Sequence, residues 1–135
     1  MVNFGDHVDQ TVFNQILEMD DDEQTRDFSM PLVDGFFEQA ISTFHQMDQA
    51  LDARNLKELS ALGHFLKGSS ATLGFNKIRD SCQLIQQYGT GCQLDGTHEA
   101  NQEVCLKQIT DAIAVAKADV AELQTLMSKF FKSQA

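Results

Sequence analysis

The side chains best suited to chemistry lie in one short segment, between His64 and Gly68. A neutral imidazole is a good nucleophile near physiological pH. Lys67 follows His64 by three residues and Gly68 follows it by four, so on a helix both lie one turn from the imidazole. An ammonium group can balance the charge on the equatorial oxygens of a phosphoryl group under attack. These residue types therefore indicate a histidine that accepts a phosphoryl group.

Gly68 is an unusual choice inside a helix, because glycine there costs roughly 1 kcal/mol relative to alanine. A larger side chain four residues after His64 would crowd the imidazole, so the cost is understandable if a partner must approach closely. The alternative interpretation is that a stable fold simply tolerates the glycine.

The surroundings of His64 on the predicted helix are small and polar. The small residues on or beside its face are Ser60, Ala61, Gly68 and Ala71. The hydroxyl of Ser69 or Ser60, and the amide of Gln86 on the next predicted helix, are candidates to hydrogen-bond a phosphate or orient the ring. No carboxylate is within helical reach of His64, because Glu58 lies on a different turn and side. A histidine that accepts a phosphoryl group is expected to have no carboxylate beside it, because the two negative charges would repel each other.

The helical periodicity of residues 56–73 predicts that His64 is exposed. The apolar residues of this helix cluster within one arc, and they are Leu56, Leu59, Leu62, Leu66 and Leu73. His64 falls about 150° from the centre of that arc, and Phe65 falls about 110° from it. An exposed aromatic ring beside the reactive group is a candidate interface anchor, unless the first predicted helix covers Phe65.

The charge distribution favours an anion in the same region. Residues 54–79 hold five basic residues and one acid, a balance of +4, whereas the rest of the chain holds five basic and nineteen acidic residues, or −14. The two parts sum to the net charge of −10. One basic island in an acidic protein attracts anions locally, although chance clustering on a solvated face would look the same.

Five helical segments are predicted to position these residues, and no repeat or second domain is visible. A short one covers about residues 11–19, with Asp9 or Thr11 as its candidate cap. It runs into an acidic segment, 20–23, that is typical of a solvated turn. The long ones start near Asp27 or Ser29, at Asn55, at Asn76 and near His98, and the last ends near Lys132. Gly74 and Gly89 are expected stops, and residues 89–97 form a connection.

Four long amphipathic helices with short connections predict an all-α fold, an antiparallel up-down four-helix bundle with a short extra N-terminal helix as a lid. A chain of 135 residues is expected to form one domain, with the bundle core at about residues 28–132. Because the seam of the last helix is used internally, we expect a monomer.

Composition excludes several classes of function. The net charge argues against binding to nucleic acid or an anionic membrane. No segment approaches the length of a membrane span and no secretory signal is visible, so an intracellular location is expected. Three cysteines without a CxxC pair indicate reduced, incidental thiols. No metal site is expected, since His45, His64 and His98 form no pair at ligand spacing, and His7 is expected at the surface with His45 and His98.

The segment His64-Phe65-Leu66-Lys67-Gly68-Ser69-Ser70-Ala71-Thr72-Leu73-Gly74-Phe75 resembles the signature of histidine-containing phosphotransfer (HPt) domains, whose core is His-x-x-Lys-Gly followed by small residues. The similarity extends to residues 19–22, 44–47 and 82–86 and is closest to the fungal members of osmosensing multistep phosphorelays. Other members carry a longer acidic insertion before the last helix, which this chain lacks.

The resemblance implies that His64 takes a phosphoryl group from the receiver domain of a hybrid histidine kinase and passes it to downstream response regulators. It implies that Lys67 assists the phosphate, that Gly68 permits close docking, and that Ser69 and Gln86 support the site. The implied partner surface includes Ile16 and Met19 from the first helix. It also includes Phe65 and the small residues Ala61 and Ala71 beside His64. The protein would hold no cofactor of its own, the receiver would supply Mg²⁺, and the location would be cytoplasmic and nuclear.

Two other classes of function remain as alternatives. A non-catalytic helical adaptor would use the Phe65 surface without chemistry. A helical enzyme with His64 as general base would need a pocket and a second catalytic group, and the sequence suggests neither. Lys67-Gly68 has the wrong order and context for a phosphate-binding loop, so neither an ATP site nor autokinase activity is expected.

Overall fold

The computed structural model describes residues 3–91 and 101–134, and every regular element in these ranges is a helix. They are the 3-10 turn η1 (Gly5–His7), α1 (Gln10–Leu17), α2 (Ser29–Asp52), α3 (Leu56–Leu73), α4 (Asn76–Gly89) and α5 (Gln102–Gln134). The all-helical fold class is therefore confirmed. The predicted connection at 92–97 and the predicted helix start at His98 lie outside the described residues.

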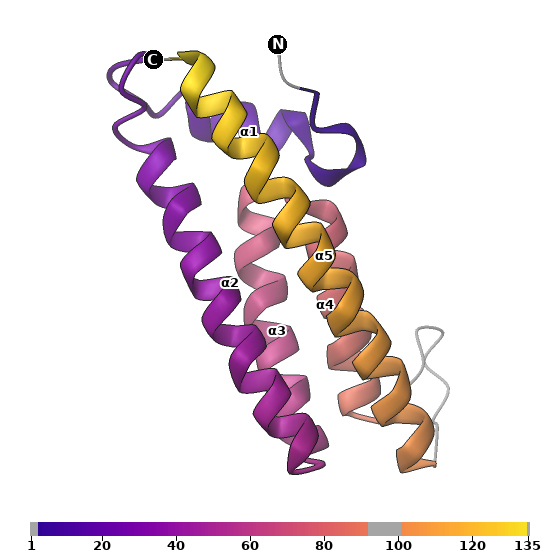
Figure 1. Ribbon diagram of the computed structural model, residues 1–135. Helices are drawn as coiled ribbons and strands as arrows, with labels where there is room; N and C mark the ends of the chain where they lie inside the picture. The colour runs from indigo at the N-terminus through magenta and orange to yellow at the C-terminus, as the bar shows by residue number, and fades with distance from the viewer. Residues whose placement is uncertain (1–2, 92–100, 135) are drawn as a thin grey trace.

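The four long helices lie side by side along one direction, and α1 lies across one end of them (Figure 1). Each long helix packs on two others: α3 on α4, α4 on α5, α5 on α2 and α2 on α3. None of the described helices is both long and apolar enough to cross a membrane.

The predicted stop and cap signals of α3 and the cap of α1 are confirmed. Asp9 Oδ1 accepts hydrogen bonds from the backbone N–H groups of Thr11 and Val12, which closes the start of α1. Asn55 Oδ1 accepts one from Glu58 N at 3.1 Å. Gly74 has a φ of 77°, a left-handed conformation that glycine adopts without a steric penalty. The ends of α3 are thus set by local residues.

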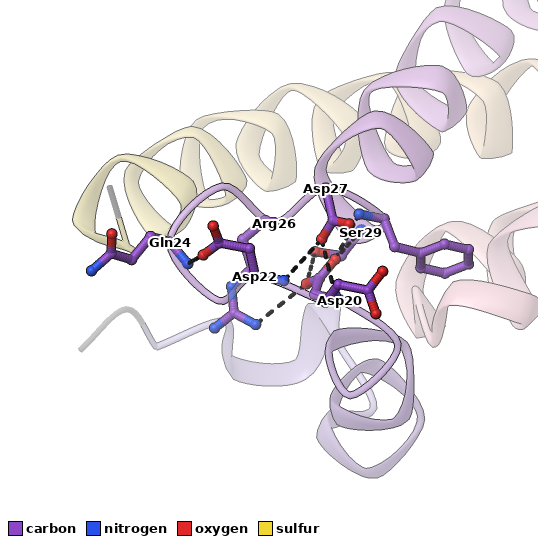
Figure 2. Close-up of polar contacts among 8 residues, drawn as sticks. Asp20, Asp22, Gln24, Arg26, Asp27 and Ser29 are labelled. Atoms are coloured by element: carbon purple, nitrogen blue, oxygen red, sulfur yellow. Dashed lines mark hydrogen bonds and ion pairs between the residues drawn. The ribbon is translucent and has the colours of Figure 1, made fainter.

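The start of α2 is different, and the two predicted caps are wrong. Neither Asp27 nor Ser29 caps this helix; instead the Asp20 carboxylate accepts hydrogen bonds from Phe28 N at 2.8 Å and Ser29 N at 2.6 Å (Figure 2). Asp27 Oδ1 bonds backward to the N–H groups of Asp21 and Asp22. A cap eight residues upstream is not visible in a local sequence pattern.

Asp20 also corrects the expectation that residues 20–23 form a solvated turn. Its side chain is fully shielded from solvent, accepts a hydrogen bond from Ser29 Oγ at 2.6 Å and lies 3.3 Å from Arg26 Nη1. Burial alone would raise the pKa of Asp20, but the hydrogen bonds from Ser29, Phe28 and Arg26 outweigh it and hold that pKa below its usual value. Only Asp21, Asp22 and Glu23 are exposed as predicted.

A cluster of aromatic rings joins α1 to the long helices. Phe13 of α1 is fully buried, with its ring centroid 5.8 Å from that of Phe4 and 6.3 Å from that of Phe75. Phe75, between α3 and α4, stacks on Phe37 of α2. Asp9 N donates to Gly74 O at 2.6 Å, next to an isolated bridge between Val8 and Phe75. The N-terminal segment is therefore anchored on the α3–α4 connection.

Candidate functional site

His64 lies in the middle of α3 and its side chain is exposed, as the helical periodicity predicted. The opposite face of the same helix is buried, with Leu59 and Leu66 completely inaccessible to solvent. The imidazole is therefore held on a rigid helix whose other side is fixed in the core.

His64 opens onto a shallow hollow between α3 and the end of α4. The residues that line it are Lys57, Ser60, Ala61, His64, Gln86, Gly89 and Thr90. Not one of these lining residues is a carboxylate, so an anion in the hollow meets no like charge from its walls. The hollow thus combines a nucleophile, a cation, hydroxyl groups and an amide.

Gln86 is brought to His64 by the packing of α4 on α3. Its backbone oxygen accepts a hydrogen bond from Ser60 Oγ at 3.1 Å. Its side-chain Oε1 is buried and has no hydrogen-bond partner among the described residues. A buried amide oxygen without a partner is unfavourable. Gln86 Oε1 is therefore an acceptor that is ready for an N–H donor in the hollow that contains His64.

Two glycines that the sequence analysis did not place in the site let α3 and α4 approach closely. A Cβ at Gly63 would lie 2.9 Å from Gln86 N and 3.0 Å from Cys82 O, and a Cβ at Gly89 would lie 2.7 Å from Ser60 N. Both contacts are with backbone atoms, which cannot move aside cheaply. The position of Gln86 beside His64 therefore depends on glycine at 63 and 89.

Lys67 leans from α3 toward α4, where its Nζ donates a hydrogen bond to Gln83 Oε1 at 2.8 Å. Gln83 was not predicted as a site residue; its only signal in the sequence is that it precedes Gln86 by three residues and so shares its helix face. A neutral partner orients the ammonium group without cancelling its charge.

Three of the five basic residues in the island form no ion pair. Arg54 forms an ion pair with Glu103, and Arg79 forms one with Asp80. Lys57, Lys67 and Lys77 form no ion pair with any carboxylate in residues 3–91 and 101–134. Two of these three lysines, Lys57 and Lys67, flank the histidine.

Gly68 faces open space, since a Cβ built there would meet nothing within 4 Å. Packing within the chain thus gives no reason for glycine at this exposed position. The close approach of a partner surface to His64 would be a sufficient reason for glycine at this position.

Ser69 is not brought together with His64. It lines a different hollow, between α2 and α3, with residues such as Pro31 and Gly35. Its hydroxyl donates to Phe65 O within the same helix at 3.4 Å. Its supporting role stays a prediction.

The predicted partner residues are mostly exposed. Phe65 keeps 49% of its surface accessible, so α1 does not bury its ring. Met19, just after α1, keeps 61%. Ala61 and Ala71 are also exposed. Ile16 is the exception, because at 8% exposure it belongs to the core and can offer little area to a partner.

Cys82, His45 and His7 lie outside the hollow that contains His64. Burial raises the pKa of the Cys82 thiol to about 12, so this cysteine is no nucleophile at neutral pH. His45 is exposed as expected, whereas His7 is buried at 4% exposure, which corrects the expectation of a surface residue. His98 lies outside the described residues.

A larger hollow lies between the first turns of α2 and the last turns of α5, lined among others by Arg26, Phe37 and Phe131. It contains none of the predicted site residues. His64 therefore lies outside this larger hollow, on a more open face that suits a macromolecular partner.

The chain is similar to known proteins over most of its length. The family model described as "Hpt domain" matches residues 31–128. Multistep phosphorelay regulator 1 of Schizosaccharomyces pombe is 40% identical over 129 residues, which are 95% of this chain and 43% of that protein. Phosphorelay intermediate protein YPD1 of Candida albicans is 47% identical over 88 residues, which are 65% of this chain and 47% of that protein. The chain thus spans less than half the length of these curated relatives.

One similar solved structure is a co-crystal of the Saccharomyces cerevisiae histidine phosphotransfer signaling protein Ypd1 with the receiver domain of its downstream response regulator Ssk1. The match covers 100% of this chain and 100% of the matched chain. The TM-score is 0.83 and the sequence identity is 30%. The similarity therefore extends over the whole helical fold described above.

Proposed function

Because the chain belongs to the Hpt domain family, we propose that it is a phosphorelay intermediate whose His64 carries a phosphoryl group between receiver domains. The observation that carries the proposal is an exposed imidazole on a rigid helix, flanked by unpaired lysines, in a hollow whose walls hold no carboxylate. The protein is then a stoichiometric carrier, without an ATP site of its own.

The step is an in-line displacement at phosphorus. The lone pair of one His64 ring nitrogen forms an N–P bond while the P–O bond of the receiver's aspartyl phosphate breaks, and the aspartate leaves as a free carboxylate. Transfer to the next receiver is the same exchange in reverse, with an aspartate oxygen attacking and the imidazole leaving. Lys67 balances charge on the equatorial oxygens. The Gln86 side chain either donates an amide N–H to a phosphoryl oxygen or accepts a hydrogen bond from a ring N–H on its Oε1.

The partner is proposed to be a receiver domain, first that of a hybrid histidine kinase and then that of a downstream response regulator. The co-crystal of the related yeast protein with a receiver domain supports this choice. Mg²⁺ would be supplied by the receiver. Docking would use Phe65, Met19, Ala61 and Ala71 around His64, and Gly68 would let the receiver approach.

The framework is proposed to be an antiparallel up-down four-helix bundle with a short extra N-terminal helix, forming a single domain over residues 1–135. The ring of helix contacts and the alternating course of the long helices in Figure 1 support this arrangement. A location in cytoplasm and nucleus, and a role in osmosensing, are part of the same proposal and rest on the resemblance.

The decisive experiment is transfer from a ³²P-labelled receiver domain, without ATP, to wild type, His64→Gln and His45→Gln. His45 is the matched control because it is an exposed histidine on a different helix, α2. We expect an acid-labile label on wild type and on His45→Gln, and none on His64→Gln. If several receivers label none of the three, a non-catalytic adaptor that uses the exposed Phe65 surface becomes the better explanation.

A further inference from the structure

We propose that His7, Asp119 and Glu122 form a divalent metal site of the zinc class that ties the N-terminal segment to α5. One imidazole nitrogen and one oxygen from each of the two carboxylates lie within 4.8 Å of one another. His7 precedes the two carboxylates by more than a hundred positions, and all three residues are far in sequence from His64. This site is separate from the phosphoryl site and does not depend on it.

The buried imidazole is the strongest indication of a ligand. The His7 side chain is 5% exposed, and its Nε2 points to Glu122 Oε2 at 3.3 Å. Neither ring nitrogen forms a hydrogen bond within residues 3–91 and 101–134. A cation bound between Nε2 and Glu122 would use the imidazole lone pair that no hydrogen bond uses, and would offset part of the roughly 1–3 kcal/mol that a buried polar atom without a hydrogen bond costs. Neutral imidazole is also the commonest metal ligand in proteins.

The backbone segments that carry the three ligands are held in place before any ion binds. On the N-terminal side, Phe4 and Val8 on either side of η1 are buried, and His7 N donates to Phe4 O at 3.1 Å. On the other side, Asp119 and Glu122 are three residues apart on α5, so both project from the same helix face. The three ligands therefore come from two anchored backbone segments.

The donor set selects the class of ion. Imidazole nitrogen and carboxylate oxygen together suit zinc, which binds them at about 2.0–2.2 Å and often keeps a water as fourth ligand. In the tetrahedral arrangement that zinc prefers, two donor atoms at that bond length lie about 3.3–3.6 Å apart, so side-chain rotations must bring the carboxylates inward. Glu122, whose side chain is 64% exposed, is able to make that rotation. Two carboxylates and one neutral imidazole give the site a charge of −2, which a divalent cation neutralises.

The test is calorimetric titration of the full, untagged chain with ZnCl₂, together with thermal unfolding followed by circular dichroism with zinc or with EDTA. All variants carry Cys92→Ser, because a thiolate would bind zinc by itself. We expect one equivalent of zinc and a higher unfolding temperature with zinc. Glu122→Gln and His7→Gln should each weaken binding at least tenfold, and His45→Gln should leave it unchanged.

Glu122→Gln keeps the test valid even if the buried His7→Gln variant fails to fold, since Glu122 is on the surface. The proposal is overturned if the Cys92→Ser chain binds no zinc at micromolar concentration, which would leave His7 and Glu122 as a simple ion pair. It is also overturned if zinc binds equally well to Glu122→Gln and Asp119→Asn.

Discussion

Gly68 is not required by the fold, but it is explained by the docking of a partner. Its surroundings are open, so the chain itself would accept a side chain there. Alanine should even stabilise α3 by about 0.5–1 kcal/mol, as expected for a glycine in a helix interior. The glycine is therefore best explained by the approach of a partner to His64.

We predict that Gly68→Gln keeps the fold and slows phosphoryl transfer strongly, because the added side chain occupies the approach to His64. Far-UV circular dichroism and the rate of label transfer from a receiver measure the two effects. Ala118→Gln, which adds the same side chain at an exposed position of α5, is the control and should transfer normally. Unchanged transfer by Gly68→Gln would remove the steric part of the argument.

Phe65 is the exposed aromatic residue next to the histidine, and its ring can anchor a partner. We predict that Phe65→Ala weakens receiver binding roughly tenfold, as is common for a central aromatic anchor, while the free energy of unfolding changes little. Calorimetric titration with a receiver domain measures the affinity. Ile41→Ala on α2 is the control, because Ile41 is 56% exposed and lines a hollow between α2 and α5 that excludes His64. Equal losses in the two variants would argue against a specific anchor.

At the scale of the elements, the contact between α3 and α4 determines the site, because it places Gln83 and Gln86 beside Lys67 and His64. We predict that Gly63→Ala destabilises the protein by about 1–3 kcal/mol, since its Cβ would press on the backbone of α4. Chemical denaturation measures this change. Gly68→Ala, the same substitution on the same helix in open space, should be neutral or stabilising. A harmless Gly63→Ala would show that the two helices can separate without cost.

The N-terminus of α2 also depends on a contact between separate segments, because Asp20 caps it from eight residues upstream. We predict that Asp20→Asn lowers the free energy of unfolding by about 1–3 kcal/mol at neutral pH, because asparagine loses the buried charge and the Oδ2 acceptor that bonds Ser29 Oγ and Arg26. The exposed Asp21→Asn is the control and should change it by less.

The pH dependence of this effect follows from the lowered pKa of Asp20. The stabilisation is complete above the pKa of an unfolded aspartate, about 3.9, and is lost as the pH falls through the lower pKa of the folded state. The difference between wild type and Asp20→Asn should therefore be constant above about pH 5 and shrink below about pH 4. Urea denaturation at several pH values tests this, and a difference that grows toward acid would contradict it.

For the whole molecule, the important feature is that the apolar seam of α5 is used within the chain. Ile109, Ala116 and Leu123 have no accessible surface. We therefore predict a monomer, with a mass near 15.1 kDa in light scattering at micromolar concentration. A species of twice that mass would show that another surface pairs two copies.

Much of the candidate site was predictable because it is local to one helix. The leucine arc of α3 predicts which face is buried, and so predicts that His64 is exposed with Lys67 and Gly68 one turn away. The caps at Asp9 and Asn55 and the stop at Gly74 were predictable for the same reason, since each acts within a few residues. Helix periodicity is a property of consecutive residues, and the sequence displays it directly.

The rest was decided by packing between segments that are distant in the chain. The partner of Lys67, the tight contacts at Gly63 and Gly89, the burial of Ile16 and the remote cap by Asp20 all depend on how one element lies against another. His7 shows this most clearly, because its neighbours Asp119 and Glu122 come from the opposite end of the chain. No local pattern encodes such contacts, since they follow from the fit of whole helices against one another.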